Sequence, residues 1–143
     1  AGRIKLDKHH LRTKKDLNNN TRSNINISLD GLNIFNFAIN NVPVIIHKLS
    51  KNIKIRYCFL HQANKMIQES IEKQISNRKI IFPNSLKDFG NTSSATIPIT
   101  ICHNYFNRQL SGYSLLCGFG VGLSMSAIII NLKKTKIFKI FKI

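Results

Sequence analysis

A stretch of twenty residues without a charge, Tyr113–Leu132, constrains the fold of this chain more than any other part of it. Its length, the four-residue spacing of Gly118 and Gly122, and the Lys133-Lys134 pair that follows are typical of a transmembrane helix. However, Gly118, Gly120 and Gly122 fall within five residues, which weakens a helix and favours a tight turn between two strands. The apolar runs on either side of the glycines have the length of buried strands. Periodicity alone leaves a membrane helix and a β-hairpin both open.

The composition bounds the class of protein. A chain of 143 residues is one domain or a fragment of a larger one, and its apolar content of 43% is sufficient for a core. The formal charge of +16 attracts nucleic acid, anionic lipid or an acidic protein. The lysines are scattered, however, and accompanied by abundant Ile and Asn, as an AT-rich genome would produce. We therefore discount the charge and expect no nucleic-acid partner.

The cysteines and the start of the chain indicate the compartment. Cys58, Cys102 and Cys117 form neither a CxxC pair nor a spacing suited to a metal, so we expect no metal site. An odd number of cysteines without a secretory signal favours reduced thiols and a cytoplasmic protein. The start at Ala1, without an initiator Met, resembles a cut end or a fragment boundary.

The two ends of the chain show few signs of regular structure. Residues 1–27 are polar and basic and are predicted to form an arm, although Ile25 and Ile27 alternate as in a short strand. We interpret the His9-His10 pair as solvated rather than bound to a ligand. Residues 133–143 interleave Lys with large apolar side chains, which predicts either a frayed tail or an amphipathic segment on an anionic surface.

The first predicted helix begins after Ser28, a good N-cap, with Asp30 in its first turn. Pro43 lies inside this helix and is expected to kink or divide it. Apolar residues recur at three- and four-residue spacing and predict a buried face: Leu32, Phe35, Ala38, Ile39, Val42, Ile45, Ile46 and Leu49.

His61 follows a β-rich run, Arg56–Leu60, and precedes a predicted helix over roughly Ala63–Ile75. It therefore lies at the carboxyl end of a strand, the edge at which open α/β sheets bind ligands. Asn91 follows Gly90 and precedes a second predicted helix that runs from Thr92 to about Tyr105, despite Pro98 near its first turn. A structural interpretation of each residue stays open, with His61 as an N-cap and Asn91 as a turn residue.

Four motifs in order resemble the C-terminal half of 3-oxoacyl-(acyl-carrier-protein) synthase III, a condensing enzyme of the thiolase superfamily. The match covers roughly residues 28–132. Any one motif would be weak evidence, but the four in this order and spacing are strong: Leu29-Asp30-Gly31 with Phe35, His61-Gln62-Ala63-Asn64, Gly90-Asn91-Thr92-Ser93-Ser94 with Ile97-Pro98, and Gly118-Phe119-Gly120-Val121-Gly122-Leu123-Ser124.

The resemblance implies an α/β fold, a thiolase-like half-domain with a mixed, five-stranded type of sheet and helices on both faces. In that fold the uncharged stretch is a β-hairpin rather than a membrane span. The chain then divides into a basic arm (1–27), the ketosynthase-like domain (28–132) and the tail (133–143).

The resemblance also implies the site. His61 and Asn91 occupy the family's catalytic His and Asn positions, where a neutral His N–H and an Asn N–H stabilise a thioester enolate. One such donor is typically worth about 3–4 kcal/mol of barrier. The backbone amide of Val121 matches the oxyanion-hole donor. Gly31, Phe35 and Asn64 fall where the family lines its pantetheine tunnel.

The implied reaction is the decarboxylative condensation of an acyl thioester with malonyl-acyl carrier protein, in fatty-acid biosynthesis. Acyl-CoA and malonyl-acyl carrier protein are substrates, and no other cofactor is expected. The family's nucleophilic Cys lies in the N-terminal half, which this chain lacks, so we expect the isolated chain to be inactive and the complete enzyme to be a homodimer. Two alternatives remain: a catalytically silent interaction module, and a small membrane-associated protein that uses residues 113–143.

Overall fold

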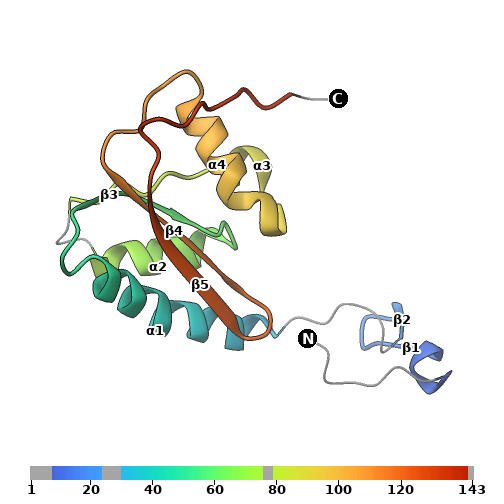
Figure 1. The fold of residues 1–143 in the computed structure, drawn as a ribbon. Coiled ribbons are helices and arrows are strands. Elements are labelled where there is room, and N and C mark those ends of the chain that lie inside the picture. Colours follow the sequence, from blue (N-terminus) through green and yellow to red (C-terminus); the bar gives the residue numbers. More distant parts are fainter. Residues whose placement is uncertain (1–7, 24–29, 76–78, 142–143) are drawn as a thin grey trace. The chain divides into compact units, whose positions relative to one another are not determined.

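The computed structural model describes residues 8–23, 30–75 and 79–141 (Figure 1). The chain forms two compact units, Ala1–Gly31 and Leu32–Ile143, which are described separately. The predicted N-cap Ser28 and the alternating Ile25 and Ile27 lie outside the described residues.

The first unit contains a short hairpin that the hydrophobic pattern of the sequence does not predict. A 3-10 helix, η1 (Lys8–Leu11), precedes strands β1 (Thr13–Lys15) and β2 (Thr21–Ser23), which pair antiparallel. Asp16 joins the two strands, because its carboxylate accepts a hydrogen bond from Arg22 Nε at 2.7 Å and from the backbone N–H of Asn20 at 2.9 Å. These bonds, led by that of Asn20, lower the pKa of Asp16. Polar contacts rather than an apolar core hold this hairpin.

The second unit is built on a mixed sheet of three strands in the order β3 (Ile55–Leu60), β4 (Tyr113–Gly120) and β5 (Ser124–Asn131). β3 and β4 are parallel, with Leu60 opposite Cys117, whereas β4 and β5 are antiparallel, with Gly120 opposite Ser124. A single parallel bridge between Tyr57 and Ile81 extends the sheet beyond β3.

The uncharged stretch forms the hairpin β4–β5, so the hairpin interpretation is correct. None of the helices in the described ranges is long and apolar enough to cross a membrane. Gly122 takes φ +148° in the turn, and a Cβ there would lie 2.9 Å from Ser124 Oγ. A side chain at this position would therefore strain the turn.

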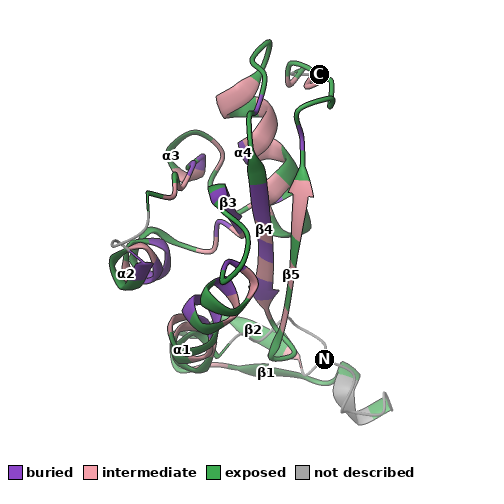
Figure 2. Cartoon of the chain, turned by 60° about the vertical axis from the view of Figure 1, so that its left-hand side comes forward, coloured by how far each residue is buried: buried purple, intermediate pink, exposed green. Residues whose placement is uncertain are grey.

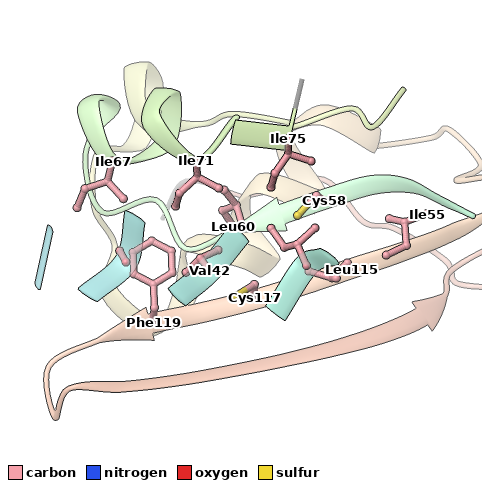
Figure 3. Close-up of a cluster of buried hydrophobic side chains, with 12 residues drawn as sticks. Val42, Ile55, Cys58, Leu60, Ile67, Ile71, Ile75, Leu115, Cys117 and Phe119 are labelled. Carbon is pink, nitrogen blue, oxygen red and sulfur yellow. The ribbon is translucent and has the colours of Figure 1, made fainter. Parts of the chain in front are cut away.

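Helices cover both faces of the sheet (Figures 1 and 2). On one face, α1 (Gly31–Leu49) and α2 (Lys65–Ile75) bury aliphatic side chains against β3 and β4. Figure 3 shows Ile67, Ile71 and Ile75 of α2 directed at this sheet face, with Val42 of α1 beside them. This arrangement confirms the predicted α/β class with helices on both faces, although the sheet has three strands within the described residues and not the predicted five.

The other face is covered by α4 (Thr96–Tyr105), which follows the short helices α3 (Leu86–Phe89) and η2 (Ser93–Ala95). Here Tyr57 and Phe59 of β3 contact the ring of Tyr105 edge-on, at centroid distances of 5.2 and 5.8 Å. Because both faces of the sheet are covered, side chains on either side of β3 are buried.

The predicted helix boundaries are close to the observed ones, with two corrections. α1 runs through Pro43 as one helix and is not divided there. Leu32, expected on its buried face, is 71% exposed, because the contacts of α1 with the core begin one turn later. Pro98, which lies within the second predicted helix, is in the first turn of α4. Its missing N–H costs no helical hydrogen bond at this position.

Candidate active site

His61 follows β3 directly. Its backbone N–H donates to the carbonyl of Cys117 at 2.9 Å, which extends the pairing of β3 with β4 by one residue. The ring contacts Phe119 edge-on with centroids 5.4 Å apart, and its Nδ1 lies 2.8 Å from the hydroxyl oxygen of Thr96. Burial lowers the pKa of His61 below its ordinary value of 6.5, and a hydrogen bond with the backbone of Ser93 opposes this shift. The imidazole is therefore mainly neutral at pH 7.

Asn91 lies beside the loop that carries His61. Its Nδ2 donates to the carbonyl of Ala63 at 3.3 Å, and its Oδ1 accepts from the backbone N–H of Ser93 at 2.9 Å. The bond with Ser93 fits the turn role that the sequence leaves open for Asn91. The bond to Ala63 joins Asn91 to the residues after β3. Gly90 makes this approach possible through φ +64° and ψ −156°, a conformation that is essentially reserved for glycine.

The structure assigns the N-cap of α2 to a residue other than His61. The side chain that caps α2 is Asn64, whose Oδ1 accepts from the backbone N–H of Ile67 at 2.9 Å. The alternative of His61 as an N-cap is therefore wrong. Asn64, expected along a pantetheine tunnel, has a local structural role at the start of α2. Its side chain is exposed, and the capping bond uses the amide oxygen but not the amide N–H groups.

Val121 lies at the same edge of the sheet as His61. β3 and β4 are parallel and end in the same direction, and the turn at Val121 follows Gly120, the last residue of β4. The Val121 side chain is 53% exposed, and its carbonyl accepts from Ser124 Oγ at 3.2 Å. This bond uses the carbonyl of Val121 and not the backbone N–H, which is the group that the resemblance assigns to the oxyanion hole.

Gly31 and Phe35 lie on α1. Gly31 is the first residue of the helix, and a Cβ added to it would meet no heavy atom within 4 Å. Phe35 is half-buried and packs against the core cluster of the second unit. A groove of about 470 Å³ lies elsewhere, between the loop after α4 and residues 133–137, and its lining includes none of the predicted site residues.

Thr96 is a site residue that the sequence interpretation does not include. It is the first residue of α4, is 1% exposed and contacts His61 through its hydroxyl group. Its place five residues after Asn91, within the helix predicted from Thr92 to about Tyr105, is the signal by which the sequence could have identified it.

The two buried thiols of this chain do not suit a nucleophile. Cys58 and Cys117 are buried, and burial raises the pKa of Cys58 well above its ordinary value and that of Cys117 to about 12. Cys102 is half-buried on α4. Because the thiolate is the reactive form, the two buried cysteines are inert at neutral pH.

Comparison with known proteins identifies the family. The model of the 3-oxoacyl-(acyl-carrier-protein) synthase III C terminal matches residues 46–132, more than half of the chain. The chain belongs to this family. His61, Asn64, Asn91, Thr96 and Val121 all fall inside the matched residues.

Individual synthases III show the same relationship. The chain is 37% identical over 115 residues to the beta-ketoacyl-(acyl-carrier-protein) synthase III of Streptococcus agalactiae, which covers 74% of the chain and 36% of that protein. It is 34% identical over 125 residues to the synthase III of Prochlorococcus marinus, which covers 81% of the chain and 37% of that protein. The chain therefore spans about a third of the length of these relatives.

Solved synthase III structures share the fold. A crystal structure of a 3-oxoacyl-(acyl-carrier-protein) synthase III at 26% identity covers 92% of the chain and 41% of its own, with a TM-score of 0.71. The 3-oxoacyl-(acyl-carrier protein) synthase of Burkholderia xenovorans, also at 26%, covers 78% of the chain and 34% of its own, with a TM-score of 0.66. The chain therefore has the thiolase-like α/β fold of synthase III.

Proposed function

We propose that this chain forms the C-terminal half of a synthase III-like acyltransferase and supplies its decarboxylation machinery. In this role His61 and Asn91 stabilise the enolate that malonyl-acyl carrier protein forms when it loses CO2. The observation that carries the proposal is the bond from Asn91 Nδ2 to the carbonyl of Ala63, which holds Asn91 beside the loop that begins at His61.

The chemistry needs donors held in place before the charge develops. Loss of CO2 leaves a carbanion whose negative charge spreads onto the thioester oxygen. Donors fixed beside that oxygen lower the barrier because they need no reorganisation during the reaction. Asn91 fits this requirement, since its amide is fixed by two bonds and one hydrogen of Nδ2 remains available for a ligand.

The acyl group needs a second protein element. The enolate carbon attacks an acyl thioester held on a cysteine, and the cysteine leaves as a thiolate. Because the buried thiols of this chain have raised pKa values, we assign that nucleophile to an N-terminal half outside these 143 residues. The partners of the proposed enzyme are this half, acyl-CoA and acyl carrier protein, with a cytoplasmic homodimer as the complete form.

Complementation tests this proposal. The chain is co-expressed with the N-terminal part of the Streptococcus agalactiae relative, and condensation is assayed with acyl-CoA and malonyl-acyl carrier protein. His61→Ala and Asn91→Ala should each lower kcat by about 10²–10³-fold, the usual loss for one such donor. Two exposed residues outside the site, His47 and Asn52, provide the matched controls His47→Ala and Asn52→Ala.

Wild-type condensation by both site variants would refute the roles of His61 and Asn91. Tight binding of the N-terminal part without turnover would instead favour the second candidate, a catalytically silent interaction module. The exposed apolar side chains on the hairpin, Val121, Leu123 and Ile128, support a protein partner for either function.

A further inference from the structure

The groove of about 470 Å³ gathers positive charge on the second unit. It lies between the loop that follows α4 and the segment that follows β5, which run side by side in both views of the chain (Figures 1 and 2). None of the residues that line it is acidic, and four are cationic: Arg108, Lys133, Lys134 and Lys136. Residues 89–143 contain no Asp or Glu, so no side chain of α4, the hairpin or this segment offsets the charge. We call this site the basic groove.

The segment after β5 is packed onto the fold where it forms the basic groove. The carbonyl of Leu132 accepts from the backbone N–H of Thr135 at 2.9 Å, which turns the chain after the strand. Leu132 is buried and Ile137 is half-buried, and both pack in the core cluster that α4 covers. On the opposite wall, the backbone N–H of Arg108 donates to the carbonyl of Tyr105 at 2.9 Å. The cations therefore lie on backbone that the fold holds in place.

Two phenylalanines beside the basic groove are exposed. The exposed fraction is 61% for Phe138 and 79% for Phe141. Lys136 Nζ lies 5.3 Å from the centroid of the Phe138 ring, and Lys139, between the two rings in the sequence, is exposed as well. Exposed aromatic rings among lysines are typical of segments that bind an anionic membrane surface. In such segments the rings lie at the boundary of headgroups and acyl chains, and the ammonium groups lie near the phosphates.

We propose that the basic groove, together with Phe138 and Phe141, is a surface that binds the headgroups of an anionic phospholipid bilayer. The four cations supply the electrostatic attraction, and a guanidinium such as that of Arg108 can bind a phosphate through two N–H groups. The two rings add apolar area that leaves water on binding. None of these residues lies in the candidate active site, so this inference does not depend on the proposed function.

This surface leaves the candidate active site open. The basic groove adjoins the end of the sheet where Tyr113 of β4 pairs with Asn131 of β5. His61 and the turn after Gly120 lie toward the other end, where β3 and β4 stop. The eight residues of β4 span about 23 Å, at about 3.3 Å per residue. A chain bound to a bilayer through the basic groove would therefore keep the edge that carries His61 accessible.

The apolar part of the surface favours a bilayer over a soluble polyanion. Nucleic acid binds cations through its phosphates and aromatic rings through base stacking. The apolar residues of this segment include Ile140, which has no ring for a base to stack on. An acidic protein would need pockets that match the two phenyl rings in shape. A bilayer accepts aromatic and aliphatic side chains without such a match.

Vesicle flotation tests this proposal on the full chain, without substrate or an N-terminal half. Vesicles of equimolar phosphatidylglycerol and phosphatidylcholine should carry the chain to the top of a density gradient, whereas vesicles of phosphatidylcholine alone should not. Added salt should reduce the bound fraction because it screens the cations. Equal binding to both kinds of vesicle would overturn the proposal.

Two triple variants separate the basic groove from the net charge of the chain. Lys133→Gln, Lys134→Gln and Lys136→Gln together should weaken binding about 10²-fold, at roughly fivefold for each cation. The matched control removes the same charge from exposed positions outside the groove and should lose much less: Lys65→Gln, Lys79→Gln and Lys87→Gln. An equal loss in both variants would show that binding follows net charge, which would overturn the proposal.

A second pair of variants tests the phenyl rings. Phe138→Ala and Phe141→Ala together should weaken binding by about tenfold or more, because two apolar side chains are removed from the interface. Leu32→Ala and Met66→Ala remove exposed apolar side chains elsewhere and should leave binding unchanged. All of these substitutions are at exposed positions, and far-UV circular dichroism checks that each variant is folded.

Binding to vesicles that persists without the two rings would contradict a bilayer as the occupant. Binding of RNA that is tighter than binding of vesicles, and equal in the wild type and the phenylalanine variant, would assign the basic groove to nucleic acid instead. Failure of the proposed function is separate, since it would appear in the complementation assay and would leave the flotation result unchanged.

Discussion

Gly90→Ala tests whether the backbone conformation of Gly90 is needed to place Asn91 beside the loop of His61. Gly90 has φ +64° and ψ −156°, and a Cβ added there would meet no heavy atom within 4 Å other than those of its chain neighbours. The substitution therefore causes no collision with the rest of the fold, and its cost is that of the backbone conformation. That cost is about 1–3 kcal/mol.

Part of the loss is offset in the unfolded chain. Alanine has fewer accessible conformations than glycine when unfolded, which recovers about 0.4–1 kcal/mol. The net decrease in the free energy of unfolding should be roughly 0.5–2 kcal/mol. Urea denaturation followed by far-UV circular dichroism suits this measurement, because the chain has no Trp to report unfolding by fluorescence.

Gly118→Ala is the matched control. Gly118 lies in β4 without a positive φ, and a Cβ there would also have no neighbour within 4 Å. Gly118→Ala should therefore not show the decrease in the free energy of unfolding that is expected for Gly90→Ala. Equal urea midpoints for Gly90→Ala and wild type, or an equal loss in both variants, would refute the claim that Gly90 is required for its conformation.

Three further predictions concern the core, a thiol and pH. Ile71→Ala should lower the free energy of unfolding by about 2–5 kcal/mol because Ile71 is fully buried. Met66→Ala, on the exposed face of α2, should change it by less than about 0.5 kcal/mol. Similar urea midpoints for the two variants would contradict this prediction. Since burial raises the pKa of Cys117 to about 12, its thiol should resist a maleimide at pH 8 until denaturant is added, and mass spectrometry of the folded protein with Cys117 labelled would contradict this. Because burial lowers the pKa of His61, the unfolded chain binds a proton there at a higher pH than the folded chain does. The free energy of unfolding should therefore fall as the pH decreases below 6.5, and His61→Gln should weaken this fall. An equal dependence of the free energy of unfolding on pH in His61→Gln and wild type would contradict the lowered pKa of His61.

The position of His61 could be predicted from sequence because its signals are local. The run before it is rich in aromatic and aliphatic residues, and the observed strand β3 (Ile55–Leu60) ends where that run ends. The amphipathic pattern of the following helix was equally clear. A residue between a strand and a helix has few possible places, so its location at a sheet edge follows from the order of the elements.

The hairpin β4–β5 could not be predicted from periodicity for a physical reason. Leu115 packs in one core cluster and Leu116 in the other, because helices cover both faces of the sheet. A strand covered on both faces loses the alternation of apolar and polar residues that identifies a strand. The resemblance to synthase III therefore decided between a hairpin and a membrane helix.

Two further features depend on contacts that no pattern of spacing contains. The exposure of Leu32 reflects where α1 first meets the sheet, which is a property of packing and not of helical periodicity. The contact of Thr96 with His61 joins residues 35 positions apart and involves a single hydroxyl group. The hairpin of the first unit depends likewise on the bonds of Asp16, which an apolar pattern does not reveal.

Two hydrogen bonds attach the segment that carries α4 to the end of β3, one from Asn91 to Ala63 and one between Thr96 and His61. Two points of attachment limit the rotation that a single point would permit, so the start of α4 is held against this edge of the sheet. The relative position of His61 and Asn91 is then set within this chain alone. Docking of an N-terminal half would change the distance of its cysteine from both residues together, without changing the spacing between them.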